Sequence, residues 1–127
     1  MLPETTNQMS DNKYTYINLD YMEMMSDGDV EMKKVMLDML LEELPMELDK
    51  MKSLLDQQNW DELGSVSHKM KSTLAFVGND EMTNANKDIE LIAKSGEEVN
   101  TIAPLVNALK DLCPKVVQEL NLEKDRL

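Results

Sequence analysis

The feature that most constrains the fold is a run of apolar residues at helical spacing from Val30 to about Gln57. Apolar side chains recur every third or fourth position, which gives one long helix a continuous face to bury. Pro45 lies inside this run and lacks a backbone donor. The apolar positions on its two sides keep the same phase, so we predict one helix kinked at the proline, not two helices.

The same pattern predicts three more long helices and a short one near the N-terminus. Asn59 is a typical N-terminal cap, and Gly78 is a typical stop at the end of the helix that Asn59 opens. The expected helices cover residues 16–25, 60–77, 80–94 and 98–122. Four long amphipathic helices with short connections predict an all-α protein, an up-down four-helix bundle with a short extra N-terminal helix.

The chain has the length of one domain, at 127 residues. Residues 1–15 are polar and show no periodicity, so we predict a flexible N-terminal tail there. We expect the bundle to span residues 16–122 and residues 123–127 to form a frayed C-terminal tail. The sequence therefore predicts a single bundle with two loose ends.

Composition and charge exclude several classes of function. A net charge of −12 argues against nucleic acid and against anionic membranes, because both attract clusters of Lys and Arg. The single cysteine, Cys113, excludes an internal disulfide. The first residues lack the basic and apolar regions of a signal peptide, and no apolar run approaches the ~18 residues of a membrane span. We therefore expect a cytoplasmic protein that binds other proteins or small ligands.

The only histidine, His68, lies in a stretch without negative charge. The chain has 25 acidic residues, yet none falls between Leu63 and Asn79, a stretch that carries Lys69 and Lys71. A phosphoryl group brings about −1.5 to −2 charges, which nearby carboxylates would repel. A neutral imidazole is a nucleophile, and lysine supplies compact positive charge for phosphate oxygens. This stretch is suited to holding a phosphoryl group on His68.

Helical spacing places small residues around His68. Gly64 and Ser65 lie one turn before it, and Ser72 and Ala75 lie one and two turns after it. An ordinary solvated face carries long charged side chains instead. Small neighbours leave the imidazole accessible, so this pattern predicts close approach by another protein.

These residues resemble those of a known family. The segment 68–71 (His-Lys-Met-Lys), with Gly78 ten residues after the histidine, resembles histidine-containing phosphotransfer (HPt) domains of multistep two-component relays. Segments 41–45 and 59–61 are similar to the flanks of the same motif. The resemblance covers roughly residues 18–120. It implies a four-helix bundle with an exposed histidine.

The resemblance also implies roles for individual residues. His68 would take a phosphoryl group from an aspartate of one receiver domain and pass it to another. Lys71 and Lys69 would stabilise the phosphate, and Glu90 matches a position that orients the histidine in some family members. The close-approach face would consist of Gly64, Ser65, Ser72, Ala75 and Gly78.

Partners and cofactors follow from the resemblance as well. It implies response-regulator receiver domains and a hybrid sensor histidine kinase as partners. The protein would be a monomeric phosphoryl carrier without kinase activity of its own and without a cofactor, because the receiver domain would supply Mg²⁺. An N-terminal Met and polar ends favour a free-standing protein. The single histidine and single cysteine argue against a transition-metal site.

Two positions depart from the family pattern, and two other functions stay open. Ser72 stands where the family usually has glycine, and Asn86 stands where it often has cysteine or a small apolar residue. One alternative is a helical interaction module that docks receiver domains or other signalling proteins without being phosphorylated. The other is an enzyme with His68 as general base, which would need a second catalytic group in a cleft.

Overall fold

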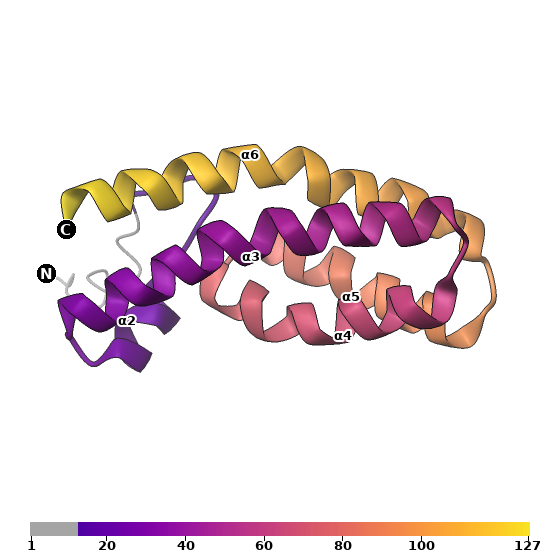
Figure 1. The fold of residues 1–127 in the computed structure, drawn as a ribbon, viewed down its shortest axis with the longest axis horizontal. Coiled ribbons are helices and arrows are strands. Elements are labelled where there is room, and N and C mark those ends of the chain that lie inside the picture. Colours follow the sequence, from indigo (N-terminus) through magenta and orange to yellow (C-terminus); the bar gives the residue numbers. More distant parts are fainter. Residues whose placement is uncertain (1–12) are drawn as a thin grey trace, which may run out of the picture.

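The computed structural model describes residues 13–127, and every regular element in that range is helical. The elements are α2 (Asp20–Ser26), α3 (Val30–Asp56), α4 (Trp60–Val77), α5 (Asp80–Ser95), the 3-10 turn η1 (Val99–Thr101) and α6 (Ile102–Arg126). The four long helices run alongside one another, and α3 and α6 project past α4 and α5 at the end where α2 lies (Figure 1). The predicted all-α four-helix bundle with a short extra N-terminal helix is confirmed.

Side-chain caps fix the starts of the long helices. Asp29, Asn59 and Asn79 each accept a hydrogen bond from the backbone N–H three residues further on. Such caps satisfy donors that the first turn of a helix leaves unpaired. Gly78 and Gly96 end α4 and α5 with φ angles of 73° and 74°. Gly78 ends α4 and Asn79 caps α5, so these two residues form the whole connection between the two helices.

One apolar stripe from each long helix forms the core. α3 passes through Pro45 as a single helix, and Leu44 and Leu48 on its two sides are both buried. α4 packs against α3 and α5, and α6 packs against the same two helices from the other side. The largest fully buried side chains are Ile17, Met22, Leu37, Leu40, Leu44, Leu48, Met51, Leu63, Met70, Leu74, Met82 and Ile89.

The C-terminal end is ordered, contrary to the predicted frayed tail over residues 123–127. α6 continues to Arg126, and Glu123 is only 4% exposed. The Glu123 carboxylate is bound by Lys33 Nζ at 2.6 Å, by the Tyr14 hydroxyl at 2.6 Å and by Arg126 at 3.0 Å. These ion pairs and hydrogen bonds hold the last turns of α6 on the bundle.

The segment before α2 is also held in place. Glu119 of α6 accepts hydrogen bonds from the three backbone N–H groups of residues 15–17, at 2.7–3.1 Å. The predicted flexible tail over residues 1–15 is therefore wrong at its C-terminal end, because this carboxylate fixes the backbone there. The part of that tail over residues 1–12 lies outside the described residues.

Candidate functional site

His68 lies in the middle of α4 with its side chain 61% exposed. Ser65, Ser72 and Ala75 are exposed on the same helix. Their side chains are short, so none of them extends as far from the axis of α4 as the imidazole does. The exposed imidazole is therefore open to a partner that approaches this helix face.

The main partner of His68 is the buried carboxylate of Glu90 on α5. His68 Nδ1 lies 2.7 Å from Glu90 Oε2, and Glu90 is only 7% exposed. An ionised carboxylate only accepts hydrogen bonds, so Nδ1 carries the proton of the neutral ring. The other ring nitrogen, Nε2, then keeps its lone pair. The site thus presents a nucleophilic nitrogen at its exposed edge.

Two lysines share the Glu90 carboxylate with His68. Lys94 Nζ lies 2.7 Å from Oε2, and Lys71 Nζ lies 3.2 Å from Oε1. The hydrogen bonds from Lys94, His68 and Lys71 lower the pKa of Glu90 from 4.5 to about 2, against the opposing effect of its burial. Glu90 is therefore charged at any physiological pH and remains an acceptor for Nδ1–H.

Lys94 is a residue of the site that the sequence reasoning missed. Its signal in the sequence is the four-residue spacing from Glu90, which puts an acid and a lysine on one helix face. That spacing became informative only once Glu90 was found against His68. Lys94 adds a second ammonium group to the carboxylate that holds the imidazole.

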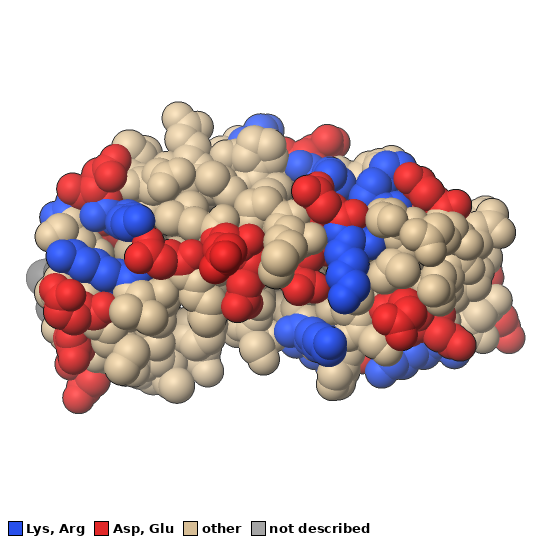
Figure 2. Space-filling model, viewed as in Figure 1, with Lys and Arg blue, Asp and Glu red and all other residues tan. Residues whose placement is uncertain are grey.

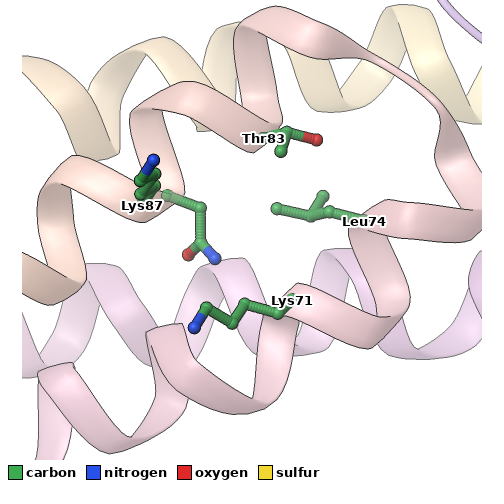
Figure 3. Close-up of a pocket in the computed structure, with 5 residues that line it drawn as sticks. Lys71, Leu74, Thr83 and Lys87 are labelled. Carbon is green, nitrogen blue, oxygen red and sulfur yellow. The ribbon is translucent and has the colours of Figure 1, made fainter.

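The two predicted lysines lie on different sides of α4. Lys71 lines a small pocket between α4 and α5, with a volume of about 160 Å³. Figure 3 shows Lys71 and Leu74 of α4 facing Thr83 and Lys87 of α5 across this pocket. The pocket has an apolar wall and ammonium groups at its rim.

Lys69 lies toward α3 instead. It lines a shallow groove together with Glu43 and Glu47 of that helix. The structure therefore brings Lys71, but not Lys69, onto the Glu90 carboxylate that holds His68. That Lys71 and Lys69 stabilise a phosphate stays a prediction.

Comparison with known families gives a match over most of the chain. The family model of the Hpt domain matches residues 35–121, which include α4 and α5 with the whole site. This chain belongs to the Hpt domain family. A search of the curated proteins finds no match. Hpt domains are helical phosphocarrier modules of two-component phosphorelays, they are not enzymes, and they interact with receiver domains and kinases.

Two glycines expected on the close-approach face of this Hpt domain lie elsewhere. Gly64 is buried, because it faces α5, and a Cβ there would lie 3.5 Å from Ala93 and Lys94. Gly78 ends α4, and a Cβ there would lie 2.0 Å from the backbone oxygen of Asn18. Gly78 thus allows the segment before α2 to pass close to α4. The small residues that remain beside His68 are serines and alanine.

Ser67 and Asn86 form a buried polar pair between α4 and α5. Ser67 Oγ lies 2.8 Å from the Asn86 carbonyl oxygen and 2.8 Å from its Oδ1. Asn86 Nδ2 donates to the Ser67 carbonyl oxygen at 2.9 Å. The sequence placed Ser67 on the buried face and marked Asn86 as a departure from the family, but it did not pair them.

Charged side chains of both signs lie on one face of the domain (Figure 2). On the face drawn in Figure 2, acidic and basic side chains are interspersed among larger areas of other residues. Within residues 13–127, no cluster of three or more His, Cys, Asp or Glu side chains is placed to hold a metal ion. No helix in the same range is long and apolar enough to cross a membrane.

Proposed function

We propose that His68 accepts a phosphoryl group from the aspartyl phosphate of one receiver domain and passes it to an aspartate of another. The observation that carries this proposal is the contact between His68 Nδ1 and Glu90, which leaves Nε2 exposed with a free lone pair. A hybrid sensor histidine kinase is the proposed source of the first phosphorylated receiver.

The transfer follows from the tautomer that Glu90 selects. The Nε2 lone pair attacks phosphorus, an N–P bond forms, and the P–O bond to the donor aspartate breaks with its electron pair leaving on the carboxylate. Because Nδ1 keeps its proton, the ring becomes a phosphoimidazolium cation. Glu90 Oε2 lies 2.7 Å from Nδ1, which carries that proton, and stabilises the cation. In the return step, neutral imidazole is the leaving group.

The lysines balance the charge that arrives with the phosphoryl group. Lys71 and Lys94 are about half exposed and lie on Glu90 before the transfer. Their flexible stems allow either ammonium to turn from the carboxylate to the phosphoryl oxygens. The Ser72 hydroxyl, one turn after His68, is a further donor for these oxygens. Lys69, on the α3 side, is the more distant cation.

The partner completes the site. The receiver domain supplies Mg²⁺ and the aspartate, and the short side chains of Ser65, Ser72 and Ala75 let it approach Nε2 closely. We propose that the protein works as a monomer in the cytoplasm, with no kinase activity of its own. The monomeric state and the absence of kinase activity are testable with the purified protein.

The test is a two-step relay with radiolabelled phosphate. A phosphorylated receiver domain is mixed with the wild-type protein, and a second receiver is then added. We expect acid-labile, base-stable label first on the wild type, then base-labile aspartyl phosphate on the second receiver, and no label on His68→Gln. Absence of label on folded wild-type protein from every receiver tried would contradict the proposal and favour a docking module that is not phosphorylated.

A further inference from the structure

The buried Ser67–Asn86 pair joins α4 to α5 directly beneath the phosphoacceptor. Ser67 is 0% exposed and immediately precedes His68, and Asn86 is 1% exposed and lies one helical turn before Glu90. The pair therefore links, from inside the bundle, the same two helices that the His68–Glu90 hydrogen bond links at the surface. This arrangement connects the interior packing to the geometry of the site.

The hydrogen bonds of the pair depend on one relative placement of the helices. Three contacts of 2.8–2.9 Å join the two residues in both directions. Hydrogen bonds weaken steeply outside a narrow range of distance and angle. A slide or rotation of α4 against α5 would break these contacts together and leave buried polar atoms unpaired.

Apolar contacts specify this placement less sharply. The hydrophobic effect is not directional, and the core of α4 and α5 includes the flexible side chains of Met70 and Met82. Among the described residues, Ser67–Asn86 is the hydrogen-bonded side-chain pair between α4 and α5 that is buried at both ends. Directional bonds in a low-dielectric interior are the contacts that select one register.

The His68–Glu90 contact needs that register. His68 Nδ1 and Glu90 Oε2 are 2.7 Å apart, and a displacement of about 1 Å would remove the hydrogen bond. We propose that Ser67 and Asn86 are positioning residues, which hold α4 and α5 in the register that lets Glu90 fix the His68 ring with Nε2 outward. The use of Nε2 for transfer rests on the proposed function, but the positioning itself does not.

The charged groups around His68 come from three helices and are left unchanged by substitutions at this pair. They are Glu90 and Lys94 on α5, Lys71 and Lys69 on α4, and Glu43 and Glu47 of α3 across the groove beside Lys69. A change in the tautomer of the imidazole after substitution of the buried pair therefore reports a change in the position of His68 relative to Glu90.

The test is the double variant Ser67→Ala/Asn86→Leu. It removes both polar side chains, so no buried side-chain donor or acceptor of the pair stays unpaired. The pocket of about 160 Å³ that Asn86 lines beside Leu74 gives the leucine room. We expect the double variant to unfold at the same or a higher denaturant concentration than the wild type.

His68 is the only histidine, so nitrogen NMR reports its tautomer without ambiguity. We expect the wild-type ring to carry its proton on Nδ1. In the double variant, we expect a shift toward the Nε2–H form, which an unconstrained imidazole prefers in water. This readout needs no receiver domain, so it stands even where the relay experiment fails. A purely structural role would change stability and leave the tautomer unchanged.

Reaction with phosphoramidate, a small phosphoryl donor, gives a second readout without a partner. We expect phosphorylation of the double variant to be roughly tenfold slower, because a misplaced nucleophile or supporting group costs rate steeply. The control is Ser53→Ala/Gln57→Leu, which removes an exposed pair of similar chemistry (3.0 Å) at the end of α3. This control should match the wild type in both readouts.

Ser67→Ala alone covers the case in which the double variant does not fold. It removes the hydroxyl but keeps the Asn86 Nδ2 bond to the Ser67 carbonyl oxygen, so we expect a smaller shift of the tautomer in the same direction. An unchanged, Nδ1-protonated ring in whichever variant folds would overturn the proposal.

Discussion

Glu90 is the residue on which the geometry of the site depends. Its buried carboxylate binds His68, Lys71 and Lys94, so one side chain fixes the tautomer of the ring and holds two ammonium groups beside it. The pKa of Glu90, lowered to about 2, keeps this acceptor charged. The site thus consists of an exposed nucleophile and a buried anion that orients it.

The lowered pKa of Glu90 predicts how stability depends on pH. A carboxyl group whose pKa falls from 4.5 to about 2 on folding contributes stability above pH 4.5. That contribution is lost as the pH falls from about 4.5 through about 2. Glu90→Gln lacks this titration, so we expect its free energy of unfolding to fall less than that of the wild type over this range. Urea unfolding at a series of pH values measures it, and parallel curves would contradict the assignment.

Lys71 and Lys69 offer a matched pair of substitutions. Lys71 lies on Glu90, whereas Lys69 lies in the groove with Glu43 and Glu47. We expect Lys71→Ala to slow phosphoryl transfer roughly tenfold, because it removes a donor close to the developing charge. We expect Lys69→Ala to have a much smaller effect, and both variants to keep the helical circular dichroism of the wild type. Equal rates for the two variants would contradict this placement.

At the scale of the helices, the ends of the elements determine where the site lies. Asn59 and Asn79 open α4 and α5, and Gly78 closes α4 next to Asn18. The tight connection makes α4 and α5 antiparallel neighbours, and this brings Glu90 opposite His68. The site is therefore a consequence of the caps as much as of the motif.

Gly78 and Gly96 separate two effects of a glycine at a helix end. Both have positive φ, but a Cβ at Gly78 would meet Asn18 at 2.0 Å, whereas a Cβ at Gly96 has nothing within 4 Å. We expect Gly96→Ala to cost about 1 kcal/mol from backbone strain, and Gly78→Ala to cost about 2–4 kcal/mol from strain plus the clash. Thermal or urea unfolding compares them. Equal losses would show that the segment before α2 does not need this contact.

Periodicity and caps were sufficient to predict the elements but not all of their contacts. The spacing through Pro45, the cap at Asn59 and the stop at Gly78 gave the long helices nearly as the structure has them. Helical spacing alone placed Gly64 on the exposed face of α4, because spacing does not reveal which side of α4 is covered by α5. The order of the C-terminal turns depends on Glu123 meeting Lys33, a contact between distant segments that no local pattern shows.

The motif predicted the nucleophile, and three-dimensional packing supplied its environment. His68, Lys71 and Glu90 were identified from sequence, and the structure brings these three together. Lys94 and the Ser67–Asn86 pair were not identified as parts of the site, because their roles arise only when α4 lies against α5. A lone acid or amide in a sequence does not indicate its partner on another helix.

In the whole molecule, the site and the main buried ion cluster lie on different elements. Lys33 of α3 binds Glu123 of α6 at 2.6 Å and also binds Glu23 of α2, whereas His68 is on α4. Lys33 and Glu123 are less than 10% exposed. The cluster holds α2, α3 and α6 together at the end where α3 and α6 project (Figure 1). The two regions should therefore respond separately to substitution.

Removal of one partner from this cluster should destabilise the fold. We expect Lys33→Met to cost about 3–5 kcal/mol, because it leaves the buried Glu123 carboxylate without its main counter-ion. The matched control is Lys124→Ala, which breaks an exposed pair with Asp38 and should cost about 0–1 kcal/mol. Urea unfolding distinguishes them. Below the unfolding range, Lys33→Met should keep the wild-type transfer rate, and a loss of transfer without unfolding would show that the two regions are coupled.

The most direct test of the central claim is to identify which nitrogen of His68 carries the phosphoryl group. Glu90 holds Nδ1, so the account predicts the N–P bond at Nε2. Phosphorus–nitrogen coupling in NMR spectra of the nitrogen-labelled, phosphorylated protein identifies the bonded atom, and the single histidine makes the assignment unambiguous. Coupling to Nε2 is the predicted result. Coupling to Nδ1, or phosphate found on another residue, would contradict the account.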